Sequence, residues 1–129
     1  MTHFRLAALS SLVLLLAAGC AHEPPVVGLL DVTARPAEKA LLSGIRAYDD
    51  GQYAESEKQL KLAVSTGLAS PKDAAAAQKH LAFIFCTSNR TADCEGAFRA
   101  ARKADPSFAL SKSEQGHPAW GPVYKRVQP

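Results

Sequence analysis

The sequence predicts an all-α domain of two helical hairpins, followed by a C-terminal capping segment with a short helix. Beyond Pro36, alanine, leucine, lysine and glutamate dominate and β-branched residues become sparse, which favours helices. Apolar residues recur there at spacings of three and four, which places them on one helix face. Small residues also recur at an interval of 38 positions, which indicates two copies of one unit.

Residues 1–19 are typical of an export signal. Arg5 is their only charge, and a mostly apolar run follows from Leu6 to Ala18. A helix of these thirteen residues spans roughly 20 Å, too short for a hydrocarbon core of about 30 Å, so a permanent transmembrane helix is the weaker interpretation. The run LAAGC, which ends at Cys20, resembles the lipobox of bacterial lipoproteins. The resemblance implies that cleavage leaves Cys20 as a lipid-bearing N-terminus; ordinary secretion and an uncleaved anchor are the alternatives.

Acylated Cys20 is thus the expected contact with membrane lipid, and two or more acyl chains suffice for stable anchoring. Neither of the next two residues, Ala21 and His22, is the Asp that retains many lipoproteins in the inner membrane. The resemblance therefore implies the periplasmic face of the outer membrane.

Residues 20–35 are predicted to form a lipidated tether. Pro24 and Pro25 favour an extended path, which would hold the domain some tens of ångströms from the membrane. The apolar residues at 26–30 complicate this interpretation, because they could instead pack on the domain or pair with a partner.

The remaining chain is one modest domain of residues 36–129. Without residues 1–19 the formal charge falls from +3 to +2, that is 14 basic minus 12 acidic residues. This near-neutral balance gives no electrostatic case for binding nucleic acid or anionic lipid heads. We expect no cofactor and no small-molecule substrate.

The first hairpin is expected to contain helices over 36–50 and 53–66. Pro36 suits an opening turn, and Gly51 and Gly67 close the two helices. The first helix carries an apolar stripe of Ala40, Leu41, Gly44, Ile45 and Tyr48. The second is expected to bury Leu60, Ala63 and Val64.

The second hairpin is expected to contain helices from about Ser70 to Cys86 and from about Thr91 to Lys103. Pro71 suits the first helical position, and the Asp105-Pro106 pair stops the last helix. Phe98 and Ala101 are expected to point inward.

The two hairpins repeat one pattern of small and aromatic residues. The first copy offers Gly44, Tyr48, Gly51, Tyr53, Ser56, Leu60 and Ala63, and the second offers Ala82, Cys86, Asn89, Thr91, Cys94, Phe98 and Ala101. We expect Gly44 to face Ser56 and Ala82 to face Cys94, because antiparallel helices approach closely where side chains are small. The pattern resembles tetratricopeptide repeats. A generic pair of helical hairpins is the alternative.

Two repeats are fewer than the three or more that usually form a stable array, so further features must cover the ends. One candidate is a disulfide between Cys86 and Cys94, which flank the predicted turn of the second hairpin. Closing a nine-residue loop contributes about 2.5 kcal/mol on the chain-entropy estimate. Two buried thiols are the alternative.

The second candidate is the C-terminal segment, in which turn residues alternate with apolar anchors. Ser111 and Glu114 have the spacing of a capping box for a short helix. Gly116, Pro118, Gly121 and Pro122 are expected to force turns, while Phe108, Leu110, Trp120, Val123 and Tyr124 are available to pack. These residues either cap the fourth helix or, through Trp120 and Tyr124, form an exposed interaction patch.

Several motifs together carry a more specific resemblance. GQYAESEKQL, NRTADC, DPSFAL and GHPAWGPVYKRV, following the lipobox, resemble the TssQ-type lipoproteins associated with bacterial type VI secretion systems. The similarity runs from about residue 38 to 127. It implies an accessory, envelope-anchored protein with an envelope protein partner of unknown identity and no catalytic residues.

Catalysis has little support in the residues themselves. No histidine pair has the spacing of a helical zinc site, so no metal ligand is expected, and no phosphate loop or nucleophile elbow is present. We therefore expect a binding protein rather than an enzyme. The candidate polar contacts are Arg46, Gln52, Lys79, Arg99 and Lys103, each of which could equally be a solvated side chain.

Two alternatives to the secretion accessory remain at this point. One is a pilotin-like assembly lipoprotein, which escorts an envelope channel subunit to the outer membrane. The other is a purely structural spacer that recognises no defined peptide.

Overall fold

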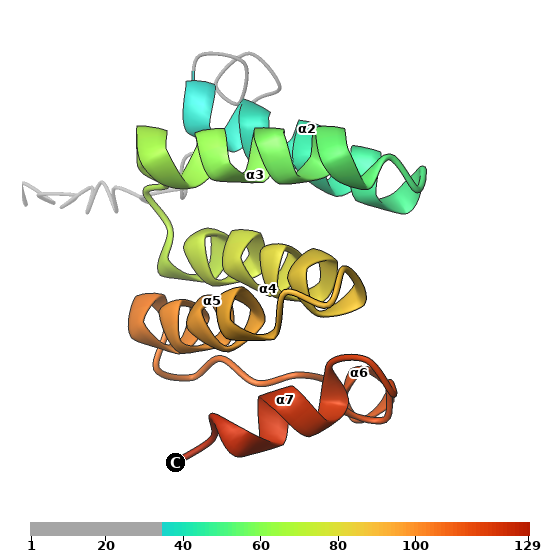
Figure 1. Cartoon of the computed structure of the whole chain (residues 1–129). Helices are drawn as coiled ribbons and strands as arrows, with labels where there is room; N and C mark the ends of the chain where they lie inside the picture. Colours follow the sequence, from blue (N-terminus) through green and yellow to red (C-terminus); the bar gives the residue numbers. More distant parts are fainter. Residues whose placement is uncertain (1–34) are drawn as a thin grey trace, which may run out of the picture.

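The computed structural model describes residues 35–129; the expected signal, Cys20 and nearly all of the tether lie outside the described residues. The described chain contains α2 (Pro36–Asp49), α3 (Tyr53–Thr66), α4 (Pro71–Thr87), α5 (Thr91–Ala104), α6 (Lys112–Gln115) and α7 (Gly121–Arg126). Figure 1 shows three layers: α2 with α3, then α4 with α5, and finally α6 with α7. The predicted all-α fold, with two tetratricopeptide-like hairpins and a C-terminal cap, is confirmed.

Local sequence explains where the long helices begin and end. Pro36 and Pro71 stand in the first turns of α2 and α4, where a missing N–H costs nothing. Gly51 and Gly67 follow α2 and α3 with φ of 74° and 98°, a conformation that glycine adopts without steric cost. Ser70 caps α4 by accepting a hydrogen bond from the Asp73 backbone N–H at 3.3 Å.

The first hairpin packs through Gly44, as the repeat pattern predicts. The Ser56 hydroxyl donates a hydrogen bond to the Gly44 carbonyl at 2.8 Å, and Leu60 fills the space beside it. Val64 was expected to be buried, and this expectation is wrong: its side chain is 38% exposed. The seam of α3 is already formed by Ser56, Leu60 and Ala63, and Val64 lies about 100° around the helix from Ala63.

The second hairpin has the same kind of seam. Ala82, Cys94 and Ala101 are fully buried between α4 and α5. At the turn, the sulfur atoms of Cys86 and Cys94 lie 2.06 Å apart, with their Cα atoms 5.2 Å apart, so the structure joins them in a disulfide.

The cap covers the second hairpin with aromatic side chains. Trp120 stacks on Phe83 with ring centroids 4.1 Å apart, and Tyr124 meets Phe98 edge to face at 5.2 Å. The expected capping box is present at the start of α6, where Ser111 and Glu114 each bond the other's backbone N–H.

The structure contains one helix that the sequence did not predict. Gly121 and Pro122 were expected to form turns, but α7 begins at these residues. Proline is compatible with a first helical turn. Gly121 is required by crowding, since a Cβ atom there would lie 2.3 Å from the Gln115 carbonyl oxygen.

Candidate functional site

The two aromatic residues expected at an interaction surface are inside the cap. Trp120 is 8% exposed and Tyr124 is 1% exposed. The indole N–H donates to the Glu114 carbonyl at 2.8 Å, and the Tyr124 hydroxyl accepts from the Leu110 N–H at 3.1 Å. Their polar atoms are satisfied internally, so of the two interpretations of this segment the structure agrees with the cap and not with an exposed patch.

The two arginines proposed as contacts are exposed but lie in different layers. Arg46 is on α2 and Arg99 is on α5 (Figure 1). Arg99 shares Glu95 with Arg126, at 3.2 and 3.1 Å. Hydrogen bonds from Arg126 and then Arg99 lower the pKa of Glu95. Arg99 therefore pairs within α5, while Arg126 of α7 joins the two helices through the same carboxylate, and Arg46 and Arg99 do not share one binding surface.

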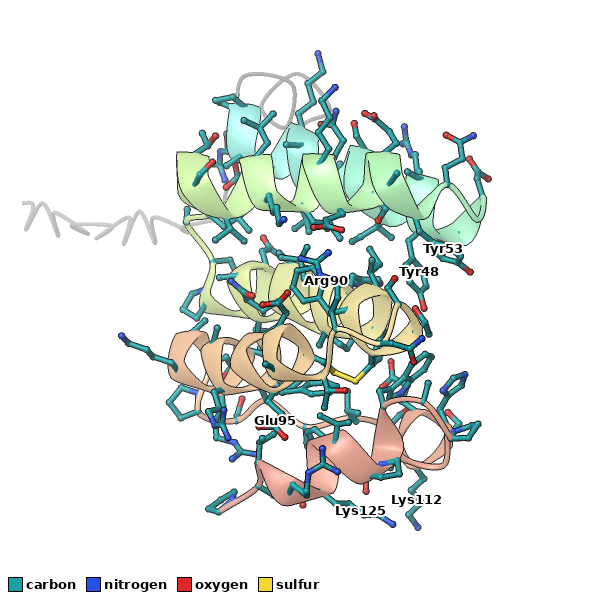
Figure 2. The ribbon with its side chains drawn as sticks, viewed as in Figure 1. Tyr48, Tyr53, Arg90, Glu95, Lys112 and Lys125 are labelled. Atoms are coloured by element: carbon teal, nitrogen blue, oxygen red, sulfur yellow. A yellow bond between two sulfur atoms is a disulfide. The ribbon has the colours of Figure 1, made fainter. Side chains whose placement is uncertain are left out.

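The structure instead brings aromatic side chains together at the end of the first hairpin. The Tyr48 ring lies edge to face against Tyr53 at 5.5 Å and against His80 of α4 at 5.2 Å. Phe83 lies beneath them, 6.4 Å from Tyr48. Tyr53 remains 51% exposed. We call Tyr48, Tyr53 and His80 the aromatic edge; Figure 2 shows both tyrosines beside the α2–α3 turn, facing the α4 layer.

Tyr48 and His80 of the aromatic edge are uncharged near neutral pH. Burial lowers the pKa of the His80 imidazole below its ordinary value of 6.5. The neutral ring can donate its Nδ1–H to the Ala76 carbonyl at 2.8 Å. Burial, followed by the nearby Tyr53 and Asp49, raises the pKa of the Tyr48 phenol. Neutral rings with one face open are suited to packing against a partner rather than to proton transfer.

An aliphatic stripe of α2 adjoins the aromatic edge. Leu42 and Ile45 lie three positions apart, beside the stripe of Leu41 and Tyr48 that faces the core. Leu42 is 42% exposed, and Ile45 is half-buried. The first hairpin therefore carries Leu42 as well as the two tyrosines of the aromatic edge, which His80 of α4 completes.

The sequence contained a signal for this surface that the repeat pattern obscured. Tyr53 follows the Gly51 turn and was assigned only as a repeat position. A second tyrosine five residues before it, Tyr48, places two rings on either side of one turn. Such a pair can be recognised from sequence, but its exposure depends on His80, which lies 27 positions beyond Tyr53.

An ionic cluster holds the first hairpin against the second and so fixes the surface. The Arg90 guanidinium, at the α4–α5 turn, contacts both carboxylate oxygens of Glu57 on α3, at 3.0 and 2.9 Å. It also bonds Asp93 at 2.9 Å and lies 4.2 Å from the Phe85 ring centroid. Figure 2 shows Arg90 between the two layers. Burial acts to raise the pKa of Glu57, but hydrogen bonds from Lys61 and Arg90 outweigh it and lower that pKa.

The histidine, cysteine and acidic side chains of the described residues do not gather into a candidate metal site. No group of three or more His, Cys, Asp or Glu side chains there has the geometry to hold a metal ion. His117 stacks on Trp120 with ring centroids 3.4 Å apart, and its Nδ1 accepts from the Ala119 N–H at 3.2 Å. His117 is thus part of the cap.

Two further findings concern known proteins and membrane-spanning helices. Comparison with protein-family models, characterised proteins and solved structures finds no match. Among residues 35–129, no helix combines the length and the apolar character needed to cross a bilayer.

Proposed function

We propose that this protein is a lipid-anchored periplasmic binding module, and that the aromatic edge with Leu42 is its partner surface. The observation that carries this proposal is the uneven distribution of exposed apolar side chains. All four large hydrophobic side chains that are exposed in the described region belong to the first hairpin: Leu42, Tyr53, Leu62 and Val64. Exposed tyrosine side chains are enriched at protein interfaces.

The neutral charge of the surface narrows the kind of partner. The Tyr48 phenol, whose pKa is raised, and the His80 imidazole, whose pKa is lowered, carry no charge near pH 7, and Leu42 is aliphatic. A partner segment with an aromatic or aliphatic anchor fits this chemistry, while nucleic acid and small polar substrates do not. The proposal includes no catalytic step, metal or cofactor.

The biological setting follows from the N-terminal sequence and the resemblance together. Cys20 after a lipobox-like run supports acylation and the periplasmic face of the outer membrane. The TssQ-like motifs support an accessory role in a type VI secretion system, with an envelope protein of unknown identity as the partner. A pilotin-like role remains the second candidate, because a small lipidated helical domain could also escort a channel subunit.

Site-specific photocrosslinking in intact envelopes tests the partner surface. A photoreactive amino acid at position 53 is expected to yield a covalent adduct with an envelope protein of the secretion system. The same amino acid at position 99, exposed on α5, serves as the matched control and is expected to give no such adduct. Leu42→Asp in the position-53 chain is expected to reduce the adduct about tenfold or more.

The outcomes separate the candidate functions. An adduct between position 53 and a secretin-like channel subunit would favour the pilotin role. Equal labelling at positions 53 and 99, or no labelling at either, would contradict the partner surface. For the anchor, Cys20→Ser is expected to move the protein from the outer-membrane to the soluble periplasmic fraction, and unchanged membrane recovery would contradict lipidation.

A further inference from the structure

The two ends of the helical stack are finished differently. The second hairpin is covered by α6 and α7, whose Trp120 and Tyr124 pack on Phe83 and Phe98. The outer side of the first hairpin has no corresponding cover among residues 35–129, and Leu62 of α3 is 50% exposed there. Terminal units of helical stacks ordinarily need such a cover.

A groove runs along this uncovered side between α2 and α3. It has a volume of about 320 Å³ and is lined by Pro36, Lys39, Ala40, Ser43, Gln59 and Leu62. A second hollow of about 330 Å³ adjoins it at Pro36 and continues toward Gly67 at the end of α3. Pro36, the first residue of α2, thus lines both hollows.

The chain preceding Pro36 carries a segment suited to this groove. Residues 26–30, VVGLL, contain four aliphatic side chains, and Asp31 follows them. Apolar side chains match Leu62 and Ala40. Asp31 complements Lys39, whose ammonium has no carboxylate partner among the described residues. We propose that residues 26–32 dock in the groove between α2 and α3 and cover the open end of the stack.

The lengths of the chain permit this docking. Three residues lie between Val32, the last docked residue, and Pro36, and this linker reaches about 13 Å. The part of α2 that lines the groove, from Pro36 to Ser43, is only about 10 Å long. Because the segment is joined to the groove by so short a linker, its effective concentration is of the order of mM. An intrinsic dissociation constant of about 0.1 mM would then keep the groove roughly 90% occupied.

Docking would set the distance between the domain and the membrane. This consequence, unlike the docking itself, rests on the proposed lipid anchor. Pro36 lies sixteen positions after Cys20, a span of up to about 50 Å, whereas Val26 lies six positions after Cys20, a span of up to about 19 Å. With residues 26–32 docked, the first hairpin would be held close to the bilayer.

Hydrogen exchange on the chain from residue 20 onward, with Cys20→Ser and no lipid present, tests the docking. The amides of residues 26–32 are expected to exchange about tenfold more slowly than in an unstructured peptide of the same sequence. Leu62→Asp is expected to abolish this protection. Leu42→Asp, at a similarly exposed leucine outside the groove, is the matched control and is expected to preserve it.

Leu29→Asp provides a second variant outside the folded domain, and it is expected to abolish the protection with unchanged helical circular dichroism. Exchange at the unstructured rate in the parent chain would overturn the proposal, as would protection that survives both Leu62→Asp and Leu29→Asp. Protection that grows with protein concentration would assign the groove to a second copy of the chain and also overturn it. No partner or membrane enters this experiment, so its failure is distinguishable from failure of the proposed function.

Discussion

Gly44 is the point of closest approach between α2 and α3, and adding one methyl group there tests the packing of the first hairpin. A Cβ atom at this position would lie 2.7 Å from Leu60 Cγ, 2.8 Å from Cδ2 and 3.1 Å from the Leu60 backbone nitrogen. Leu60 is fully buried, and its backbone belongs to α3. A rotamer change can move the side-chain atoms, but only separation of the helices relieves the backbone contact.

The expected magnitude follows from two opposing effects. Overpacking a well-filled core costs about 1–3 kcal/mol. Alanine is preferred over glycine inside a helix by up to about 1 kcal/mol, which offsets part of that cost. We therefore expect Gly44→Ala to destabilise the domain by about 1–2 kcal/mol. For a domain of this size, this lowers the Tm by about 5–15 °C.

Gly96→Ala is the matched control, because it adds the same methyl group to another helix. Gly96 lies inside α5, and a Cβ atom there has no neighbour within 4 Å. Without a clash only the helix preference remains, so the Tm is expected to rise by a few degrees, on the order of 0.5–1 kcal/mol. Thermal unfolding followed by circular dichroism measures both variants. The packing argument is refuted if both substitutions raise the Tm.

A double substitution separates overpacking from other effects of Gly44→Ala. Leu60→Ala alone is expected to cost about 2–5 kcal/mol, because it leaves a cavity. It also removes the Cγ and Cδ2 atoms that the new methyl group would meet. The double variant should therefore be less destabilised than the sum of the single changes, by about 0.5–3 kcal/mol. Strict additivity would show that Leu60 does not cause the cost.

Three further predictions concern the cap, the turn of the second hairpin and the contact between layers. Tyr124→Phe leaves the buried Leu110 N–H without an acceptor and should lower the free energy of unfolding in urea by about 1–3 kcal/mol. Tyr48→Phe, at a half-exposed ring, is the control and should lower it less. Equal losses would contradict the hydrogen bond. The disulfide closes a nine-residue loop and should stabilise the domain by about 2.5 kcal/mol, so its reduction should lower the Tm by about 10–20 °C. Equal free-thiol counts in denatured samples with and without reductant would exclude the bond. Because the pKa of Glu57 is lowered in the folded state, the ionised carboxylate stabilises the domain above the ordinary pKa of 4.5, and this stabilisation is lost as the pH falls through the folded-state pKa. Glu57→Gln should therefore reduce the drop in urea midpoint between pH 6 and pH 3. An unchanged drop would contradict the pairing of Glu57 with Arg90.

Sequence reasoning succeeded where structure is determined locally. Three of the four long helices have a proline in the first turn or a glycine after the last, and α5 ends before the Asp105-Pro106 pair. The contact of Gly44 with Ser56 could be predicted, because small residues at matching repeat positions mark where helices cross. These features depend on neighbours that are close in sequence.

The errors arose where distant residues decide the outcome. The residues next to Trp120 in sequence do not decide whether its side chain is exposed or buried. Phe83, 37 positions earlier, stacks on the indole and helps to bury it. The six-residue helix α7 is too short to be stable alone and depends on the packing of Tyr124. The aromatic edge was missed for the same reason, since His80 of the second hairpin completes a surface that begins on the first.

The position of the aromatic edge at the α2–α3 turn constrains where a partner could bind. The α2 helix of fourteen residues is about 21 Å long, and the edge lies at the end away from Pro36, where the chain enters. A lipid anchor at Cys20 would place Pro36 within about 50 Å of the bilayer, and residues 26–32 docked in their groove would bring it closer. The aromatic edge would then face a zone within a few tens of ångströms of the membrane. A membrane protein, or one held near the membrane, would lie within reach of the aromatic edge there, which agrees with an envelope protein as the partner.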